Sequence, residues 1–420
     1  MDLLIYGFLV ALIIYTIIAL LVWRFKIFGN SVQMYGPFMG IQTDKVKFFD
    51  RFKDVPFLRA YTNISTILIF VFGLFMSAMI ILVLKITLDI QPEPTGIYAP
   101  RNVFMIPGVN EFIPVTLGVF LAFVFAGAIH EFGHAIVCRA EGISIVNTGI
   151  LLAIIPIGAF VNPREEELNA ASIGSRLRVY SAGVANNFMV GVVAFFILCI
   201  AVSTLVVPII AGSVYVFETG GNVGGVSPGM YVTMVDGVPI NSSQEFNKIL
   251  NLVLGTLVAV TAGYSKEDMK IYYFDNVAGN YFDVVDRGNM PATIGNMMNL
   301  EGMLKLLVLP FDMSVTGMEL KQVMMTTQDA QIYNTPFTGF WEIIHLLYWL
   351  VFINISIAIF NAIPMVPLDG GYIFKDVMNR VFGNTRVKNH ITGIAYSISI
   401  IMFIAILGSI VLPYILKFLR

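Results

Sequence analysis

Six long apolar stretches divide the chain, at about residues 2–23, 61–84, 113–140, 178–211, 341–364 and 391–416. Each exceeds the roughly 20 apolar residues that an α-helix needs to cross the hydrocarbon core of a bilayer. The first stretch is too long for the core of a signal peptide and has no basic residue before it, so we expect it to stay as a membrane helix. The pattern predicts a polytopic α-helical membrane protein with about six transmembrane helices.

After the third stretch the apolar pattern continues but is not helical. Ile143–Val161 is rich in β-branched residues and is interrupted by Asn147, Gly149, Pro156 and Gly158. Irregular backbone at membrane depth is tolerated only where it packs against protein or lines a wet cavity. We therefore predict a re-entrant extended loop, with a loop that skims the membrane surface as the alternative.

The stretch from about 212 to 335 is more polar and is long enough for a small folded domain. It contains strand-like runs such as Lys270–Phe274, an Asp236-Gly237 turn, and the capping box Ser242–Glu245, which opens a short helix over about 246–254. This order of strand, turn, strand and capped helix resembles a PDZ domain. A soluble α+β module of another kind is the alternative.

The composition agrees with a membrane protein, because 57% of the residues are hydrophobic, 12% are charged and the mean hydropathy is +0.81. The formal net charge of -2, without a basic block interleaved with aromatic residues, argues against a nucleic-acid partner. Cys138 and Cys199 both lie in apolar runs, so we expect no disulfide framework.

Basic residues predict the orientation in the membrane. The loop between the first two stretches carries Arg24, Lys26, Lys45, Lys47, Arg51, Lys53 and Arg59, whereas the next loop carries only Lys85 and Arg101. By the positive-inside rule the first loop is cytoplasmic. The alternation then places Arg164, Arg176, Arg178 and the loop of Lys375, Arg380, Arg386 and Lys388 inside, and residues 212–335 outside. Lys417 and Arg420 fall outside, against the rule.

The third apolar stretch holds the pentapeptide His130-Glu131-Phe132-Gly133-His134. In a helix, residues four apart lie on nearly the same face, so both imidazoles can bind one metal ion with Glu131 close by. Zinc held by two histidines and a carboxylate leaves one position for water, whose pKa falls from about 15.7 toward about 7. Solvated polar residues are the alternative, but ionisable groups at bilayer depth cost several kcal/mol unless they are partnered or face water.

A third ligand has to come from elsewhere, and the candidates are Asp369, Glu342, His345, Glu141 and Cys138. Cys138 lies a full turn beyond the histidines, and buried cysteine is common. Glu342 and His345 open the fifth stretch, where polar residues usually mark the membrane interface. Asp369 follows a helix end broken by two prolines and precedes two glycines, which favours a carboxylate that turns back toward a neighbouring helix. It is our preferred ligand.

HExxH on one span, with Asn361, Pro364 and the Leu-Asp-Gly-Gly sequence around Asp369 on a later one, resembles the site-2 protease family of intramembrane metalloproteases. Ile155–Val161 is similar to the membrane-embedded extended loop of that family. The Arg178–Gly183 run before Asn187-Phe188 is similar to its Gly-Pro-x-x-Asn-Phe motif, except that Val184 replaces proline. Together with Ala159 after Gly158, that departure makes the chain look more like the branch that contains the eukaryotic sterol-pathway enzyme than the common bacterial form.

The resemblance implies a three-helix catalytic core in which His130, His134 and Asp369 bind one zinc ion and Glu131 is the general base. Asn361 would orient the substrate carbonyl or stabilise the oxyanion, or else pack and cap the broken helix. Asn187 would brace the extended loop or act in catalysis.

Four regions are expected: two N-terminal helices and their loops (1–112), the first part of the core (113–211), an extracytoplasmic PDZ-like domain (212–335), and the second part of the core with a C-terminal helix (336–420).

Such a protease would cut transmembrane segments of single-span proteins in the lipid bilayer, after an upstream protease has trimmed them outside. We expect a multi-pass protein of the cell membrane with its active site toward the cytoplasm. The 143–161 loop would hold the unwound substrate by strand addition. A metal transporter is one rival, although no inverted repeats are found and transport does not require Glu131. A scaffold without activity is another, although the motifs are intact.

Overall fold

The structure is a computed structural model that describes residues 2–53, 55–93, 95–102, 105–154, 156–210, 213–277, 279–285, 290–326, 333–383, 385 and 388–419. Ile155 of the predicted loop and Arg386 lie outside these ranges. The chain forms two compact units, Met1–Val192 with Trp349–Arg420, and Val193–Tyr348. The predicted four-region division stays a prediction.

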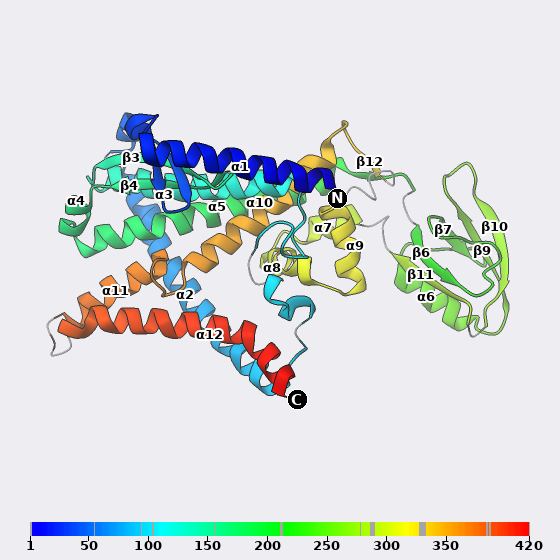
Figure 1. Cartoon of the computed structure of the whole chain (residues 1–420). Coiled ribbons are helices and arrows are strands. Elements are labelled where there is room, and N and C mark those ends of the chain that lie inside the picture. Colours follow the sequence, from blue (N-terminus) through cyan, green and yellow to red (C-terminus); the bar gives the residue numbers. More distant parts are fainter. Residues whose placement is uncertain are drawn as a thin grey trace. The chain divides into compact units, whose positions relative to one another are not determined.

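Five helices among the described residues are long and apolar enough to cross a membrane (Figure 1). They are α2 (Pro56–Ile90), α3 (Leu117–Ala140), α5 (Ile173–Leu205), α10 (Phe340–Asn361) and α12 (Ile391–Leu419). The first predicted span lies in α1 (Asp2–Phe25), of which Leu9–Phe25 is counted as a shorter apolar helix. The polytopic helical class is therefore confirmed, and the count of six stays a prediction.

Local sequence explains where the main helices begin and end. The hydroxyl of Thr116 accepts a hydrogen bond from the backbone N–H of Val119 and caps α3. Pro56 stands in the first turn of α2, where its missing N–H is not needed. The other helical segments described in the first unit are η1 (Gly29–Ser31), η2 (Lys47–Phe52), η3 (Gly96–Tyr98), η4 (Pro100–Asn102), α4 (Glu165–Ala170), α11 (Asp369–Phe382) and η8 (Lys388–His390).

The first unit also contains a four-stranded antiparallel sheet in the order β1-β2-β3-β4. Its strands are β1 (Val32–Tyr35), β2 (Phe38–Thr43), β3 (Ile145–Leu152) and β4 (Pro156–Pro163). The hairpin of β3 and β4 confirms that the loop over 143–161 is extended; its re-entry into the membrane stays a prediction. The β1–β2 hairpin was missed by the sequence interpretation, which treated this region only as a basic loop.

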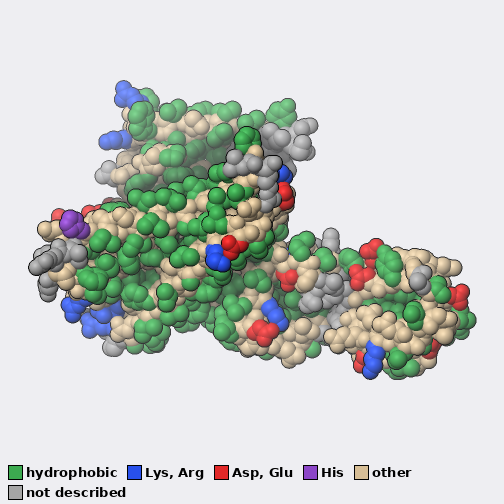
Figure 2. Space-filling model, turned by 90° about the horizontal axis from the view of Figure 1, so that it is seen from below, with side chains coloured by type: hydrophobic (Ala, Val, Ile, Leu, Met, Phe, Trp, Pro, Cys, Tyr) green, Lys and Arg blue, Asp and Glu red, His purple; other side chains and the backbone are tan. Residues whose placement is uncertain are grey.

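Apolar side chains are exposed along α2 and α12, as lipid-facing helices require. Leu74 of α2 is 75% exposed and Ile401 of α12 is 62% exposed. Figure 2 shows apolar side chains over much of the displayed face, with only scattered charged groups. This distribution supports an integral membrane protein.

The second unit contains a separate antiparallel sheet in the order β10-β9-β7-β6-β11, with β8 paired to β7. Its strands are β6 (Val214–Gly220), β7 (Tyr231–Val235), β8 (Val238–Pro239), β9 (Leu257–Gly263), β10 (Lys270–Asp275) and β11 (Tyr281–Val285). A second, two-stranded pairing joins β5 (Val207–Pro208) to β12 (Tyr333–Asn334). The helical segments of this unit are α6 (Ser243–Leu252), α7 (Met290–Asn296), α8 (Leu300–Val308), η6 (Leu309–Phe311) and α9 (Val315–Met324).

Turn and cap predictions in this unit are confirmed. Asp236 and Gly237 both have positive φ between β7 and β8. The Ser242 hydroxyl accepts from the backbone N–H of Glu245, and the Glu245 carboxylate accepts from that of Asn241. The helix begins three residues earlier than predicted and ends at Leu252. The structure thus has a mixed sheet and helix module here, and its PDZ character stays a prediction.

Candidate metal centre

Helix α3 places His130 and His134 one turn apart, with 3.2 Å between their Nε2 atoms. Asp369 Oδ2 lies 3.2 Å from His130 Nε2 and 3.4 Å from His134 Nε2. The three side chains are only 11%, 16% and 14% exposed. The ligand set predicted from the sequence therefore meets in space.

The donor chemistry fits a zinc ion. Two imidazole nitrogens and a carboxylate oxygen converge within 4.8 Å, which matches the ligand set of catalytic zinc sites with three protein ligands. Asp369 Oδ2 is buried and has no hydrogen-bond partner among the described residues. Because a buried polar atom is costly without a partner, a cation between these atoms would satisfy it.

Helix α5 supports the two histidines. The His134 Nδ1 atom lies 2.8 Å from the carbonyl oxygen of Val179, so Nδ1–H can donate there and leave Nε2 free for a metal. A Cβ atom on Gly183 would lie 2.6 Å from ring atoms of both His130 and His134. The sequence interpretation noted this glycine only as part of a motif, because sequence does not show what approaches it.

Strand β4 orients the predicted base. The backbone N–H of Val161 donates to Glu131 Oε2 at 3.0 Å. This contact fixes the carboxylate beside the metal group and at the edge of the sheet. The sequence predicted both the extended segment and Glu131, but not the hydrogen bond between them.

The glycines after Asp369 have a different role from the one predicted. Neither Gly370 nor Gly371 has a positive φ, so neither makes a sharp return. Instead, a Cβ on Gly370 would lie 2.2 Å from the Ala362 carbonyl oxygen, and one on Gly371 would lie 2.4 Å from Val366 N. Both glycines allow the start of α11 to pack against the turn that follows α10. This packing holds Asp369 in place.

The alternative third ligands are not in the metal group. Both carboxylate oxygens of Glu141 accept from Arg178, each at 2.7 Å. Cys138 is fully buried among apolar residues. Glu342 and His345 lie in the first two turns of α10, whereas Asp369 begins α11, which comes after the other end of α10.

Two asparagines singled out in the sequence keep only predicted roles. Asn361 is the last residue of α10 and partly buried. Asn187 is fully buried, and in the part of the chain that the structure describes neither its amide nitrogen nor its amide oxygen has a hydrogen-bond partner. The neighbouring Asn186, which the sequence interpretation missed, donates to the Ile129 carbonyl and accepts from the Tyr61 hydroxyl. Asn186 thus joins three helices next to His130.

A buried ion pair ties α11 to α5. Arg176 Nε donates to Asp376 Oδ2 at 2.6 Å, and the two side chains are 16% and 12% exposed. Asp376 follows Asp369 by seven residues, and Arg176 precedes Gly183 by seven. The pair therefore lies about 10 Å along each helix from the metal group, by the 1.5 Å rise per residue.

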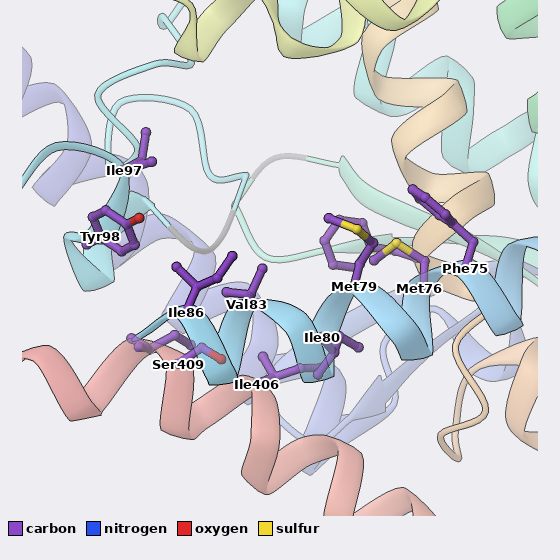
Figure 3. Close-up of a pocket in the computed structure, with 12 residues that line it drawn as sticks. Phe75, Met76, Met79, Ile80, Val83, Ile86, Ile97, Tyr98, Ile406 and Ser409 are labelled. Atoms are coloured by element: carbon purple, nitrogen blue, oxygen red, sulfur yellow. The ribbon is translucent and has the colours of Figure 1, made fainter. Parts of the chain in front are cut away.

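A separate apolar cavity of about 490 Å³ is lined by residues of α2, η3, α10 and α12 (Figure 3). Its lining includes Met79, Val83 and Ile406, with Ile97 and Tyr98 at one end. None of its lining residues belongs to the metal group. Another pocket, of about 400 Å³, includes Glu131 in its wall.

The family model described as Peptidase family M50 matches residues 118–406, which include the HExxH helix and Asp369. The chain belongs to peptidase family M50, the site-2 protease family. M50 membership and the His-His-Asp group together make it a metalloprotease that uses zinc.

Three relatives extend the comparison. An uncharacterized protein of Methanocaldococcus jannaschii is 24% identical over 86% of this chain and 84% of its own length. Two proteins named "Putative zinc metalloprotease" are 24% identical (Streptococcus pyogenes; 59% of this chain, 61% of that protein) and 23% identical (Clostridium perfringens; 70% and 95%). Placement of this M50 chain in the sterol-pathway branch stays a prediction.

Proposed function

We propose that the protein is an intramembrane zinc metalloprotease that cuts transmembrane segments of single-span proteins. The observation that carries this proposal is the convergence of Asp369 with His130 and His134. Both histidines and Glu131 lie on α3, an apolar helix long enough to span a membrane. His130, His134 and Asp369 would hold the metal. Bound zinc would polarise the substrate carbonyl and activate a water molecule.

Glu131 is the general base in this proposal. Glu131 follows His130 directly in the sequence. Among the described residues, its carboxylate accepts one hydrogen bond, at Oε2, from the backbone N–H of Val161. It can therefore take a proton from the attacking water and later deliver it to the leaving amine. Asn361 would help to orient the carbonyl or stabilise its negative charge. A metal transporter would have no use for such a positioned base.

The sheet supports a role in holding substrate. Strand β4 is the last strand of the order β1-β2-β3-β4, so one of its edges has no strand partner among the described residues. An unwound substrate could add to that edge and replace the helical hydrogen bonds that it loses. The backbone N–H of Val161 on this edge already donates to Glu131. A substrate strand could pair at Val161 only after the Glu131 carboxylate had turned from that N–H toward the attacking water.

The proposed setting is a cell membrane, with the active site toward the cytoplasm and the strand-rich module outside. Cysteines introduced near Lys45 should then react only with cytoplasmic reagents. A cysteine in place of Tyr264, whose side chain is 54% exposed in the strand-rich module, should react only with external reagents. Reaction of Tyr264→Cys from the cytoplasm would invert the orientation. Substrates would first be trimmed outside by another protease.

The module between α5 and α10 is proposed to exclude substrates with bulky external domains. A PDZ-like grip on a newly trimmed C-terminus is the second version, supported by the sheet and the capped helix α6. Replacing residues 215–332 with a short Gly/Ser linker separates them. If the module excludes substrates, the linker variant should cleave an untrimmed substrate that the parent protein does not cleave. If the module binds the trimmed C-terminus, the linker variant should cleave a trimmed substrate more weakly. No change in either substrate would reject both.

The main test uses purified protein and detergent-solubilised single-span helices. Cleavage should stop with a zinc chelator and return when zinc is restored. Cleavage that is indifferent to chelation would overturn the proposal, as would zinc uptake into sealed vesicles without any cleavage.

A further inference from the structure

The pocket of about 400 Å³ beside Glu131 is formed by the sheet, η2 and α3. We call it the Glu131 pocket. Its size falls in the range of about 300–1,000 Å³ that is usual for ligand sites. Because Glu131 contributes to its wall, an occupant of the pocket lies beside the proposed general base. The occupant of this pocket therefore bears on the choice of cleavage site.

The floor of the Glu131 pocket is one face of the sheet. Register pairs Ile41 with Ile150 and Ile150 with Ala159, which places these three side chains in one row across β2, β3 and β4. Ile41 and Ile150 are 47% and 48% exposed. Exposed apolar side chains in a row beside a catalytic group are more typical of a binding surface than of a core.

A second row, from Thr43 through Thr148 to Val161, runs parallel to the first. Its hydroxyls are already engaged. Thr148 Oγ1 donates to the Phe160 carbonyl at 3.0 Å, and Thr43 Oγ1 accepts from Lys45 N at 3.2 Å. A polar side chain entering the pocket would thus lose water and find few free partners, which is costly. The floor favours an apolar occupant.

Aromatic rings cover two glycines on the opposite face of the sheet. A Cβ on Gly40 would lie 2.6 Å from the Tyr35 ring, and one on Gly149 would lie 2.6 Å from the Phe160 ring. These two rings contact each other, with 5.7 Å between centroids. The face with Ile150 and Ala159 is the one that lines the pocket with Glu131.

The side wall of the pocket is fixed by aromatic packing. Phe49 of η2 and Phe132 of α3 both line the pocket, and their ring centroids are 5.3 Å apart. Phe49 is 7% exposed, and an ion pair between Asp50 and Arg139 also joins η2 to α3. The wall is thus braced from two elements, so the pocket has a defined shape.

We propose that the Glu131 pocket binds a large apolar side chain of the substrate, such as Leu, Met or Phe, next to the scissile bond and thereby selects the cleavage site. This inference rests on the proposed protease function. In a substrate strand alternate side chains point to the same side. One side chain could therefore enter the pocket while the backbone carbonyl of the scissile bond next to it faces the metal group.

The test uses single-span substrates that differ only at the residues flanking the cleavage site, with Leu, Phe, Ala or Asp there. Cleavage sites are mapped by mass spectrometry and kcat/KM is measured for each substrate. The Leu and Phe substrates should exceed the Ala substrate by roughly tenfold or more, which is the discrimination expected from a few methylene groups in an apolar pocket. The Asp substrate should be cut least.

Two substitutions locate that preference. Ile150→Trp fills the pocket floor and should reverse the preference toward Ala. Leu151→Trp is the matched control, because it lies on the same strand and faces the other side of the sheet. It should keep the parent preference. Zinc content and thermal melting of each variant show whether it folds.

If Ile150→Trp does not fold, Ile150→Ala provides the second test. This variant enlarges the pocket and should raise the Phe-to-Leu ratio. The proposed role of the pocket would be overturned if the parent protein showed no preference among the four substrates. It would also be overturned if the ratios of kcat/KM between the substrates were unchanged in both Ile150 variants. Either result would leave the protease function intact. No zinc-dependent cleavage of any substrate would overturn both.

Discussion

The β1–β4 sheet and the sheet of β6–β11 are stabilised in different ways. The sheet of the second unit encloses its own core, in which Val232, Val260 and Phe246 are fully buried. The β1–β4 sheet keeps Ile41 and Ile150 about half exposed and is joined to α3 through the Val161–Glu131 hydrogen bond. The first kind of sheet is a self-contained module, whereas the second is a surface built beside a reactive group.

Zinc retention should be most sensitive at the metal group. Asp369→Ala removes one of three converging ligands, so we expect zinc content and cleavage both to fall below detection. Metal analysis of the purified protein measures the loss. His345→Ala and Cys138→Ala are controls that should keep stoichiometric zinc. If His345→Ala lost its zinc and Asp369→Ala kept it, the assignment of Asp369 as the third ligand would be wrong.

A core substitution in the second sheet should affect folding without affecting the metal. Phe246 is fully buried, with its ring centroid 5.6 Å from that of Phe282, so Phe246→Ala should lower the free energy of unfolding of this module by about 3–5 kcal/mol. Hydrogen exchange over residues 214–285 would measure it. Tyr273→Ala, at a 59% exposed side chain, is the control. Loss of zinc from Phe246→Ala would show that the module is not independent.

The Arg176–Asp376 pair should have a smaller effect on zinc. Asp376→Asn leaves all three ligands but loosens α11 on α5, so we expect zinc affinity to fall by about tenfold, as for groups that orient metal ligands. Competition with a fluorescent chelator measures this change. Glu301→Gln breaks an exposed pair with Lys305 and should change nothing.

A charge-exchanged variant, Arg176→Asp with Asp376→Arg, separates positioning from general stability. Recovery of zinc affinity in this double variant would support positioning. Parent-like affinity in Asp376→Asn alone would contradict it.

Sequence predicted the features that local chemistry determines. The four-residue spacing of His130 and His134 requires only a helix, and the Ser242 cap and the Asp236-Gly237 turn require only their neighbours. Strand character over 143–161 followed from β-branched residues and helix breakers.

Features that depend on distant partners were not predicted. The β1–β2 hairpin pairs with β3, more than a hundred residues later, so its short strands carry little signal of their own. Gly183, Gly370 and Gly371 are visible in the sequence, but the atoms that approach them are not. The same holds for the Arg176–Asp376 pair, which is separated by 200 residues.

The central claim is that Glu131 is the base of a zinc protease, and Glu131→Gln tests it most directly. The amide keeps the size of the side chain but cannot take a proton, while His130, His134 and Asp369 remain. Zinc content and cleavage of a single-span substrate should be measured on the same preparation. We expect stoichiometric zinc with cleavage reduced by at least about a hundredfold. Near-normal cleavage, or loss of the zinc, would show that Glu131 is not the base.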